Sequence, residues 1–350
     1  MKKHRSIILA AVFLVLVVGL NSLFNFLLVQ PGLSRSIFHE ATGGDYECVI
    51  LGASHGSYGI ATDVVEENLG MKTMNMCMGG EYMRDAYHAL KYSMKYNNLK
   101  TVVLDIDYQY LVNYHKESIL HNAVYHAYPN GLDKVEYYKD KILAEDYRGT
   151  FLRWTNFWQC YYMIPKTVKK KTSKAYRDYD SSVVSMNKDD TYKGEGFIYR
   201  SKNAKKEKTE GISWNQNKVS ASEVSFINKI IDLCKKNNIQ IILTTVAVDP
   251  VSVAKNPENY SGAHDYIKKL ADQKEVSYYD FNYANFDQYA RSTDDFWDME
   301  GHMYGESAEH FSVVYGQVLS EAVHGTLDVN KYFGTDLKKI YASVEVTKQK

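Results

Sequence analysis

Residues 7–29 form an apolar run without a charged side chain, and its only strongly polar residues are Asn21, Ser22 and Asn25. A helix needs about 20 such residues to cross the hydrocarbon core of a bilayer. The run therefore predicts an N-terminal transmembrane helix, with residues 1–30 as a membrane anchor. The run divides the chain into one membrane-embedded segment and a polar remainder, and so limits the possible architectures of the protein.

A cleaved signal peptide and a buried core helix are the alternatives to an anchor. The apolar part of a signal peptide usually spans about 7–15 residues and ends in an Ala-x-Ala-like site. This run is longer and lacks that site, which favours a retained signal anchor. Lys2, Lys3 and Arg5 precede the run and only Arg35 follows closely. The positive-inside bias then predicts a single-pass protein of the cell membrane, with a cytoplasmic N-terminus and the chain from about residue 40 outside.

The amino-acid composition limits which classes of binding partner and cofactor are expected. Lys plus Arg and Asp plus Glu balance at 42 each, so charge gives no reason to expect a nucleic-acid partner. The four cysteines show no CxxC spacing, and neither a metal site nor a cofactor is expected. Cys48 and Cys234 lie within apolar patterns and are predicted to be buried thiols.

Short apolar runs alternate with amphipathic stretches from residue 45 onward. Alternation of this kind favours an α/β fold with a mostly parallel sheet flanked by helices, a three-layer flavodoxin-like arrangement over residues 45–330. Residues 31–44 are predicted to be a linker and residues 331–350 a C-terminal tail. The predicted strands are Cys48–Leu51, Thr73–Met76, Thr101–Ile106, Ile239–Val246 and Val276–Tyr279, and helical stripes run through 83–94, 224–234, 264–273 and 307–323.

Residues 113–218 interrupt this alternation and are rich in Tyr, Lys and Asp. A structureless loop of that length is implausible, so an inserted, partly helical cap is predicted. Its lysines, among them Lys166 and the run 169–171, fit a solvated face or a surface facing an anionic polymer or lipid headgroups. The aromatic segment Phe151–Tyr162 fits either packing or sugar stacking.

The first chemical motif is Gly52-Ala53-Ser54-His55-Gly56, which directly follows the first predicted strand. Ligands of open α/β sheets bind outside the carboxyl ends of the strands, where Ser54 is expected. The two glycines permit a sharp turn and a close backbone approach. A serine hydroxyl is a weak nucleophile at neutral pH and needs an adjacent base.

His302 is the predicted base, because Asp298 lies near enough in sequence to orient its ring and to stabilise the imidazolium. His55 is a competing base, and Asp294 or Asp295 could replace Asp298. A purely structural alternative also exists, in which Ser54 caps a helix and His302 lies on the surface.

Acyl transfer also needs hydrogen-bond donors for the oxyanion that develops on the attacked carbonyl. The Ser54 backbone N–H is one candidate, and Gly79 or Gly80, after the second strand, is the other. Asn75 and His55 are further candidates for substrate binding at the same sheet edge. The glycines could instead only form the turn into the next helix.

The motifs together resemble the SGNH (GDSL-like) hydrolase superfamily. Gly52-Ala53-Ser54-His55 is similar to its first block, the segment from Gly59-Ile60 to Gly79-Gly80 to its second, and His302-Met303…Ala308…Phe311-Ser312 to its last. With an N-terminal anchor, the chain is similar to the branch of DltD-like and polysaccharide O-acetylation proteins. The resemblance covers about residues 45–112 and 220–325 and implies an SGNH-hydrolase-like fold.

Several positions depart from the family pattern. Three residues rather than two separate Asp298 from His302, so a bulged loop is needed to bring them into register. Tyr304 replaces the usual Asn, and Ser307 the usual Gly. Asp105-Ile106-Asp107-Tyr108 occupies the place of the third block, whose Asn would donate to an oxyanion. Asp105 and Asp107 are expected to cap the following segment or to order the loop.

The resemblance implies an extracytoplasmic acyltransferase or esterase that acts on a cell-surface polysaccharide or teichoic-acid-like polymer, with O-acetyl or D-alanyl as the acyl group. Ser54 would attack, His302 would carry the proton and Asp298 would orient His302. A multi-spanning membrane acyltransferase is the implied partner. The alternative is a non-catalytic scaffold or binding protein of cell-envelope polymer assembly.

Overall fold

The computed structural model describes residues 2–112, 122–142, 150–207 and 211–344. The chain divides into two compact units. One joins Met1–Ser36 to His115–Ser185, and the other joins Ile37–Tyr114 to Met186–Lys350. The predicted insertion at 113–218 therefore does not coincide with a unit, and its residues 113–121, 143–149 and 208–210 lie outside the described part.

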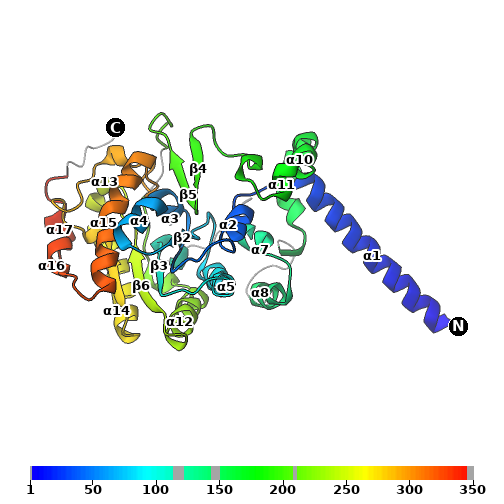
Figure 1. The fold of residues 1–350 in the computed structure, drawn as a ribbon, viewed down its shortest axis with the longest axis horizontal. Helices are drawn as coiled ribbons and strands as arrows, with labels where there is room; N and C mark the ends of the chain where they lie inside the picture. Colours follow the sequence, from blue (N-terminus) through cyan, green and yellow to red (C-terminus); the bar gives the residue numbers. More distant parts are fainter. Residues whose placement is uncertain (1, 113–121, 143–149, 208–210, 345–350) are drawn as a thin grey trace. The chain divides into compact units, whose positions relative to one another are not determined.

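The second unit is built on a five-stranded sheet in the order β2-β1-β3-β6-β7, in which every pair of neighbours is parallel (Figure 1). This confirms the predicted fold class. Each strand lies within two residues of its predicted bounds, because continuous apolar runs suit a sheet that is covered on both faces. The strands are β1 (Cys48–Leu51), β2 (Thr73–Asn75), β3 (Thr101–Asp105), β6 (Gln240–Thr245) and β7 (Ser277–Asp280).

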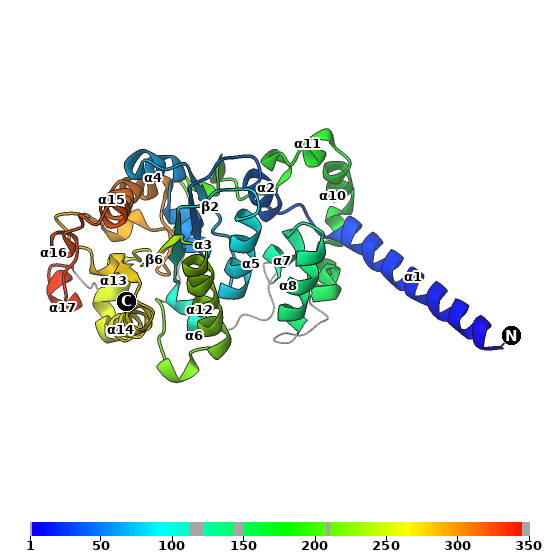
Figure 2. The same ribbon diagram turned by 60° about the horizontal axis from the view of Figure 1, so that its bottom comes forward.

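Helices cover both faces of this sheet. α4 (Thr62–Leu69) packs against α15 (Gly305–Val323) on one face, and α5 (Met83–Ser93) packs against α12 (Ala221–Lys236) on the other. α14 (Pro257–Gln273) connects β6 to β7, and the right-handed crossover rule places it on the face of α5 and α12, as Figures 1 and 2 show. α3 (Ser54–Gly59), α6 (Tyr108–Val112) and α13 (Pro250–Lys255) are short helices that follow β1, β3 and β6.

The strand order reverses at β1 and β3. From β1 the chain continues to β2 on one side, and from β3 it continues to β6 and β7 on the other. The connections leaving β1 and β3 therefore diverge, which opens a crevice at the carboxyl ends of these strands. Ser54 follows β1, and Asp107 follows β3, at this point of the sheet.

Two segments predicted to be irregular contain helices. The predicted linker 31–44 includes α2 (Ser34–Glu40), whose Ile37 and Phe38 are buried. The predicted tail, 331–350, includes the second half of α16 (Val329–Tyr332) and all of α17 (Leu337–Ile340). The Tyr341 hydroxyl donates to the Asn282 carbonyl at 2.8 Å and accepts from Arg291 at 2.8 Å. Residues 345–350 lie outside the described part.

An antiparallel hairpin also belongs to the second unit, although the predicted insertion included it. Its strands are β4 (Asp190–Gly194) and β5 (Phe197–Arg200), and β5 packs against α3 and α15. Sequence patterns missed the hairpin because its alternation is carried by Tyr, Lys and Asp rather than by aliphatic residues.

The first unit contains α1 (Lys2–Leu28), and His4–Leu28 is long and apolar enough to cross a membrane. The end of α1 packs against the 3-10 segment Arg153–Met163 and against α10 (Ile164–Lys171). The Asn21 side-chain amide donates to the Phe151 carbonyl, and the Asn25 side-chain Oδ1 accepts from the Trp154 backbone N–H. The remaining elements are α7 (Ala123–Ala127), α8 (Leu132–Ile142), α11 (Lys174–Arg177) and a 3-10 turn at Ser181–Val183.

Candidate active site

Ser54 lies at the first position of α3, three residues beyond the end of β1. The turn packs so closely on the neighbouring strands that side chains at its glycines would clash. A Cβ atom at Gly52 would lie 2.9 Å from Asp105 Cβ, and one at Gly56 would overlap Cys77. Ser54 is partly exposed although Ala53 and His55 on either side of it are buried.

Asp298 and His302 belong to a tight loop between β7 and α15. An antiparallel bridge between Phe296 and Met303 closes the loop, and the Trp297 N–H donates to the His302 carbonyl at 3.0 Å. Gly301 at its tip has φ +127°, and a Cβ there would lie 2.6 Å from Val248 Cγ1. Only glycine fits this conformation and this space. This is the bulge that the spacing between Asp298 and His302 requires.

The structure brings Ser54, His302 and Asp298 into one hydrogen-bonded chain. Ser54 Oγ lies 2.7 Å from His302 Nε2, and His302 Nδ1 lies 2.6 Å from Asp298 Oδ2. The other Asp298 oxygen accepts from the backbone N–H groups of Gly301 and His302 at 2.9 and 3.1 Å. Burial opposes ionisation of Asp298, but the His302 ring and these N–H groups outweigh it and lower the pKa of the carboxyl.

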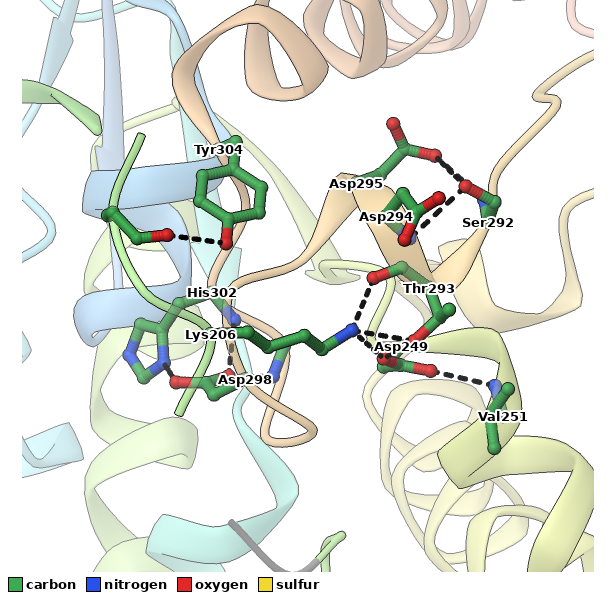
Figure 3. A network of polar contacts seen from close by, with 12 residues as sticks. Lys206, Asp249, Val251, Ser292, Thr293, Asp294, Asp295, Asp298, His302 and Tyr304 are labelled. Atoms are coloured by element: carbon green, nitrogen blue, oxygen red, sulfur yellow. Dashed lines mark hydrogen bonds and ion pairs between the residues drawn. The ribbon is translucent and has the colours of Figure 1, made fainter. Parts of the chain in front are cut away.

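Asp294 and Asp295, the alternatives to Asp298, lie elsewhere, as Figure 3 shows. Asp295 accepts from the backbone N–H of Ser292 and from the Ser307 hydroxyl, which fixes the turn before the loop. The Asp294 N–H donates to the Ser292 side chain. Among the carboxylates of the described residues, Asp298 is the one hydrogen-bonded to the His302 ring.

His55 faces Asp107 rather than the serine. Its Nδ1 lies 3.2 Å from Asp107 Oδ2, and its ring meets the His302 ring edge-on at 4.8 Å between centroids. Burial lowers the pKa of His55, and the charge of Asp107 only partly opposes this. His55 is therefore a neutral neighbour of the site. Asp107 also caps α6 through the Gln109 N–H, as expected for a residue that orders this loop.

Asn75, predicted as a further candidate for substrate binding, is buried and hydrogen-bonded within the protein. Its amide nitrogen donates to the carbonyls of Gly56 and Ile60, and its oxygen accepts from the Cys77 N–H, all in the protein interior. Both amide hydrogens are thus used to hold the end of β2 against α3. Sequence analysis could not separate this role from a free donor at the same sheet edge.

The two candidate glycines lie in the turn before α5, where both are partly exposed. Gly80 has φ +77°, and its backbone hydrogen-bonds the Tyr110 hydroxyl. Gly79 is thus the better candidate for an oxyanion donor beside the Ser54 N–H.

Asp105, in the place of the third block, points into the protein. It lies under the Ser54 turn, and its Oδ1 accepts from the Val246 N–H at 2.9 Å. Burial raises the pKa of Asp105 to about 8, and the charges of Asp107 and Asp280 act in the same direction. Asp105 is therefore mainly neutral at pH 7, and a neutral carboxyl would not repel an oxyanion as a carboxylate would.

Aromatic side chains hold the His302 ring, and sequence analysis missed them. Trp297 stacks on the imidazole with 4.9 Å between centroids and 28° between planes, and Tyr58 meets it edge-on at 5.6 Å. The Arg200 guanidinium lies 3.8 Å from the Trp297 ring centroid. Asp190 accepts from Arg200 and from the Tyr58 hydroxyl, the latter at 3.0 Å. Tyr58 is four residues after Ser54, a helical spacing that would have indicated it had α3 been predicted.

Within the described part of the chain, Asp298, Glu300 and His302 form the one group whose ligand atoms could hold a metal ion, all within 4.8 Å of one another. Both His302 ring nitrogens already face hydrogen-bond partners. A bound ion would have to displace Asp298 or Ser54 from the ring. These residues thus suit a proton relay better than a resident metal.

Comparison with known proteins gives little further information. No protein-family model and no curated protein matches the chain. Among solved structures, a similar chain is a protein of Bacteroides fragilis described as a candidate acylhydrolase. It is 10% identical with a TM-score of 0.37, and the match covers 80% of this chain and 89% of the other. A likeness of this size carries no inference about activity.

Proposed function

We propose that this protein is a membrane-anchored, serine-dependent acyltransferase or esterase of the SGNH type. The observation that carries the proposal is the chain of hydrogen bonds from Ser54 Oγ through His302 to Asp298 at 2.7 and 2.6 Å. Nucleophile, base and orienting carboxylate in this order make up the machinery of acyl transfer to and from serine.

In the first half of the reaction, Ser54 Oγ attacks the carbonyl carbon of an acyl donor, and its proton passes to His302 Nε2. The tetrahedral intermediate collapses when the bond to the leaving oxygen breaks and His302 returns the proton to that oxygen. The product is an ester on Ser54. Asp298 stays ionised throughout, because its pKa is lowered, and it stabilises the imidazolium that forms.

The second half runs in reverse with a new oxygen nucleophile. His302 removes a proton from an acceptor hydroxyl or from water, and that oxygen attacks the Ser54 ester. Collapse of the second intermediate releases Ser54 Oγ, which takes the proton back from His302. The Ser54 N–H, with Gly79 as the second donor, would stabilise the oxyanion in both steps.

The proposed location and substrate follow from α1 and from the sequence resemblance. If α1 spans the cell membrane with its N-terminus in the cytoplasm, the site faces the cell envelope. A cell-surface polysaccharide or teichoic-acid-like polymer then supplies or receives O-acetyl or D-alanyl groups. A multi-spanning membrane acyltransferase is the proposed partner that delivers the acyl group across the bilayer.

An active-site label tests the proposal directly. A fluorophosphonate probe should modify the wild-type protein at Ser54, and both Ser54→Ala and His302→Ala should abolish labelling. Ser57→Ala is the matched control, since Ser57 lies on the same helix and its hydroxyl only donates to the Ser54 carbonyl. Labelling that persists in Ser54→Ala, or that is absent from folded wild-type protein, would favour a non-catalytic scaffold.

A further inference from the structure

The first unit contains a cavity of about 290 Å³ at the end of α1. Its walls come from the last turn of α1, the residues that follow it, α7, the 3-10 segment at Arg153, α10 and α11. If α1 spans a bilayer, the apolar run ends at Leu28, and the cavity then lies at the level of the lipid headgroups. This inference rests on the anchoring that is part of the proposed function.

Positive charge converges on this cavity. Arg35, Arg153 and Lys171 all line it, and the residues described around it include neither Asp nor Glu. Burial lowers the pKa of Arg153 to about 10 and that of Lys171 to about 8, and the charge of Arg153 further disfavours protonation of Lys171. Buried cations without a counterion are costly, so proteins usually provide them with an anion.

The three cations are held in different ways. Lys171 donates to the carbonyls of Asn25 and Phe26 at 2.9 Å, where it caps the C-terminal end of α1. Arg35 donates to the Tyr176 carbonyl at 2.7 Å, and its guanidinium lies over the Tyr176 ring. Arg153 differs, because its buried Nε makes no hydrogen bond to any described atom. A guanidinium in that state is short of one acceptor, and phosphate oxygens suit it well.

The surroundings favour a lipid over a free anion. An apolar groove of about 310 Å³ adjoins the last two turns of α1 and is lined by Phe24, Leu27, Leu28, Trp158, Tyr161 and Ile164. Trp158, Tyr161 and Tyr162 are 59%, 63% and 70% exposed. Exposed Trp and Tyr beside a spanning helix are typical of the membrane–water interface. A free phosphate would use the cations but not this groove.

We propose that the cavity binds the phosphate group of an anionic membrane phospholipid through Arg153, Lys171 and Arg35, while the apolar groove on another face of α1 contacts the acyl chains of the surrounding membrane. Bound lipid would fix the end of α1 to the 3-10 segment and α10. The site would thereby determine the depth and orientation of the end of α1 at the membrane surface.

Native mass spectrometry of the full chain tests this proposal. The protein is released from detergent micelles that contain equimolar phosphatidylglycerol and phosphatidylcholine. We expect one retained phosphatidylglycerol, at least tenfold over phosphatidylcholine, and at least a tenfold loss of it in Arg153→Gln. Lys169→Gln is the matched control, because it removes the same charge from an exposed position on α10 outside the cavity and should retain the lipid.

Three results would overturn the proposal. They are equal retention of the two lipids by the wild type, equal retention of phosphatidylglycerol by wild type and Arg153→Gln, and uptake of millimolar inorganic phosphate without a lipid preference. If Arg153→Gln does not fold, two measurements on the wild-type protein test the proposal instead. They are the ratio of the two retained lipids and the melting temperature of the protein with each lipid, since selective binding raises the melting temperature. Fluorophosphonate labelling of Ser54 and membrane partitioning, measured in parallel, report separately on the proposed catalysis and anchoring.

Discussion

The hydrogen-bonding state of His302 determines what the site can do. A neutral imidazole donates from one nitrogen and accepts at the other. Asp298 has a lowered pKa and is ionised at neutral pH, so it accepts the proton of Nδ1 and leaves Nε2 free to accept from Ser54. His55, paired with Asp107 in the interior, cannot replace it. Two adjacent histidines thus differ in role because their carboxylate partners hold them differently.

The buried carboxyl of Asp105 is predicted to make the stability of the protein depend on pH. Its folded-state pKa of about 8 lies above the unfolded value of about 3.9. The stability that its neutral form contributes is therefore complete below pH 4 and is lost as the pH rises to 8. Relative to Asp105→Asn, the wild-type free energy of unfolding should fall through this range, by up to about 1.4 kcal/mol per pH unit. Urea unfolding at several pH values checks it, and parallel curves for the two proteins would contradict it.

At the scale of elements, the β4–β5 hairpin does more than cover the domain. Arg200 and Asp190 form an ion pair whose side chains are 6% and 2% exposed, and the Arg200 guanidinium lies over the Trp297 ring. The same ring stacks on His302. The hairpin therefore supports the catalytic loop through one aromatic ring, although it is more than 90 residues away in sequence.

Replacing that ring should lower turnover without unfolding the protein. In Trp297→Leu, His302 loses its stacking partner, and we expect kcat for an activated ester to fall about tenfold with little change in KM. Trp214→Leu is the control, because Trp214 contacts the rings of Tyr266 and Tyr108 rather than that of His302. Steady-state kinetics on both variants test the role of Trp297, and equal kcat values would show that the stacking is only structural.

An element could be predicted from the sequence where its own residues form a clear hydrophobic pattern. β1 matched its predicted bounds because four consecutive apolar residues are fully buried. α3 was missed because it contains two glycines and no apolar stripe, and packing against α15 and β5 determines its conformation. Ser54, Asp298 and His302 could be proposed from their neighbours in the chain. The contacts of Trp297, Tyr58 and Arg200 join distant segments, and no local pattern reports them.

The two units of the molecule fit two tasks, attachment to the membrane in the first unit and acyl chemistry in the second. α1, the 3-10 segment and α10 form one unit, and the sheet with its crevice forms the other. The lysines of α10 are not equivalent, because Lys166 and Lys169 are exposed whereas Lys171 caps α1. A combined neutralisation of Lys166, Lys169, Lys170 and Lys171 would therefore mix a surface effect with a structural one.

The anchoring by α1 leads to a prediction about membrane topology. With α1 as a retained anchor, protease added outside intact cells that expose this membrane face should digest residues after about 40. The protein should fractionate with membranes at full length. A protected domain would contradict the orientation, and quantitative release of a shortened form into the medium would contradict the anchor. A cytoplasmic protein probed in the same cells controls for lysis.

The proposed function requires that Ser54 be acylated covalently, and this can be detected by intact-mass measurement after a rapid acid quench. Wild-type protein mixed with an activated ester should gain the mass of one acyl group, which peptide mapping should place on Ser54. Ser54→Ala should gain none, and Ser54→Ala/His302→Ala should turn the ester over no more slowly than Ser54→Ala alone, since either loss removes the covalent route. An acyl group on another residue, or full turnover by Ser54→Ala, would contradict the account.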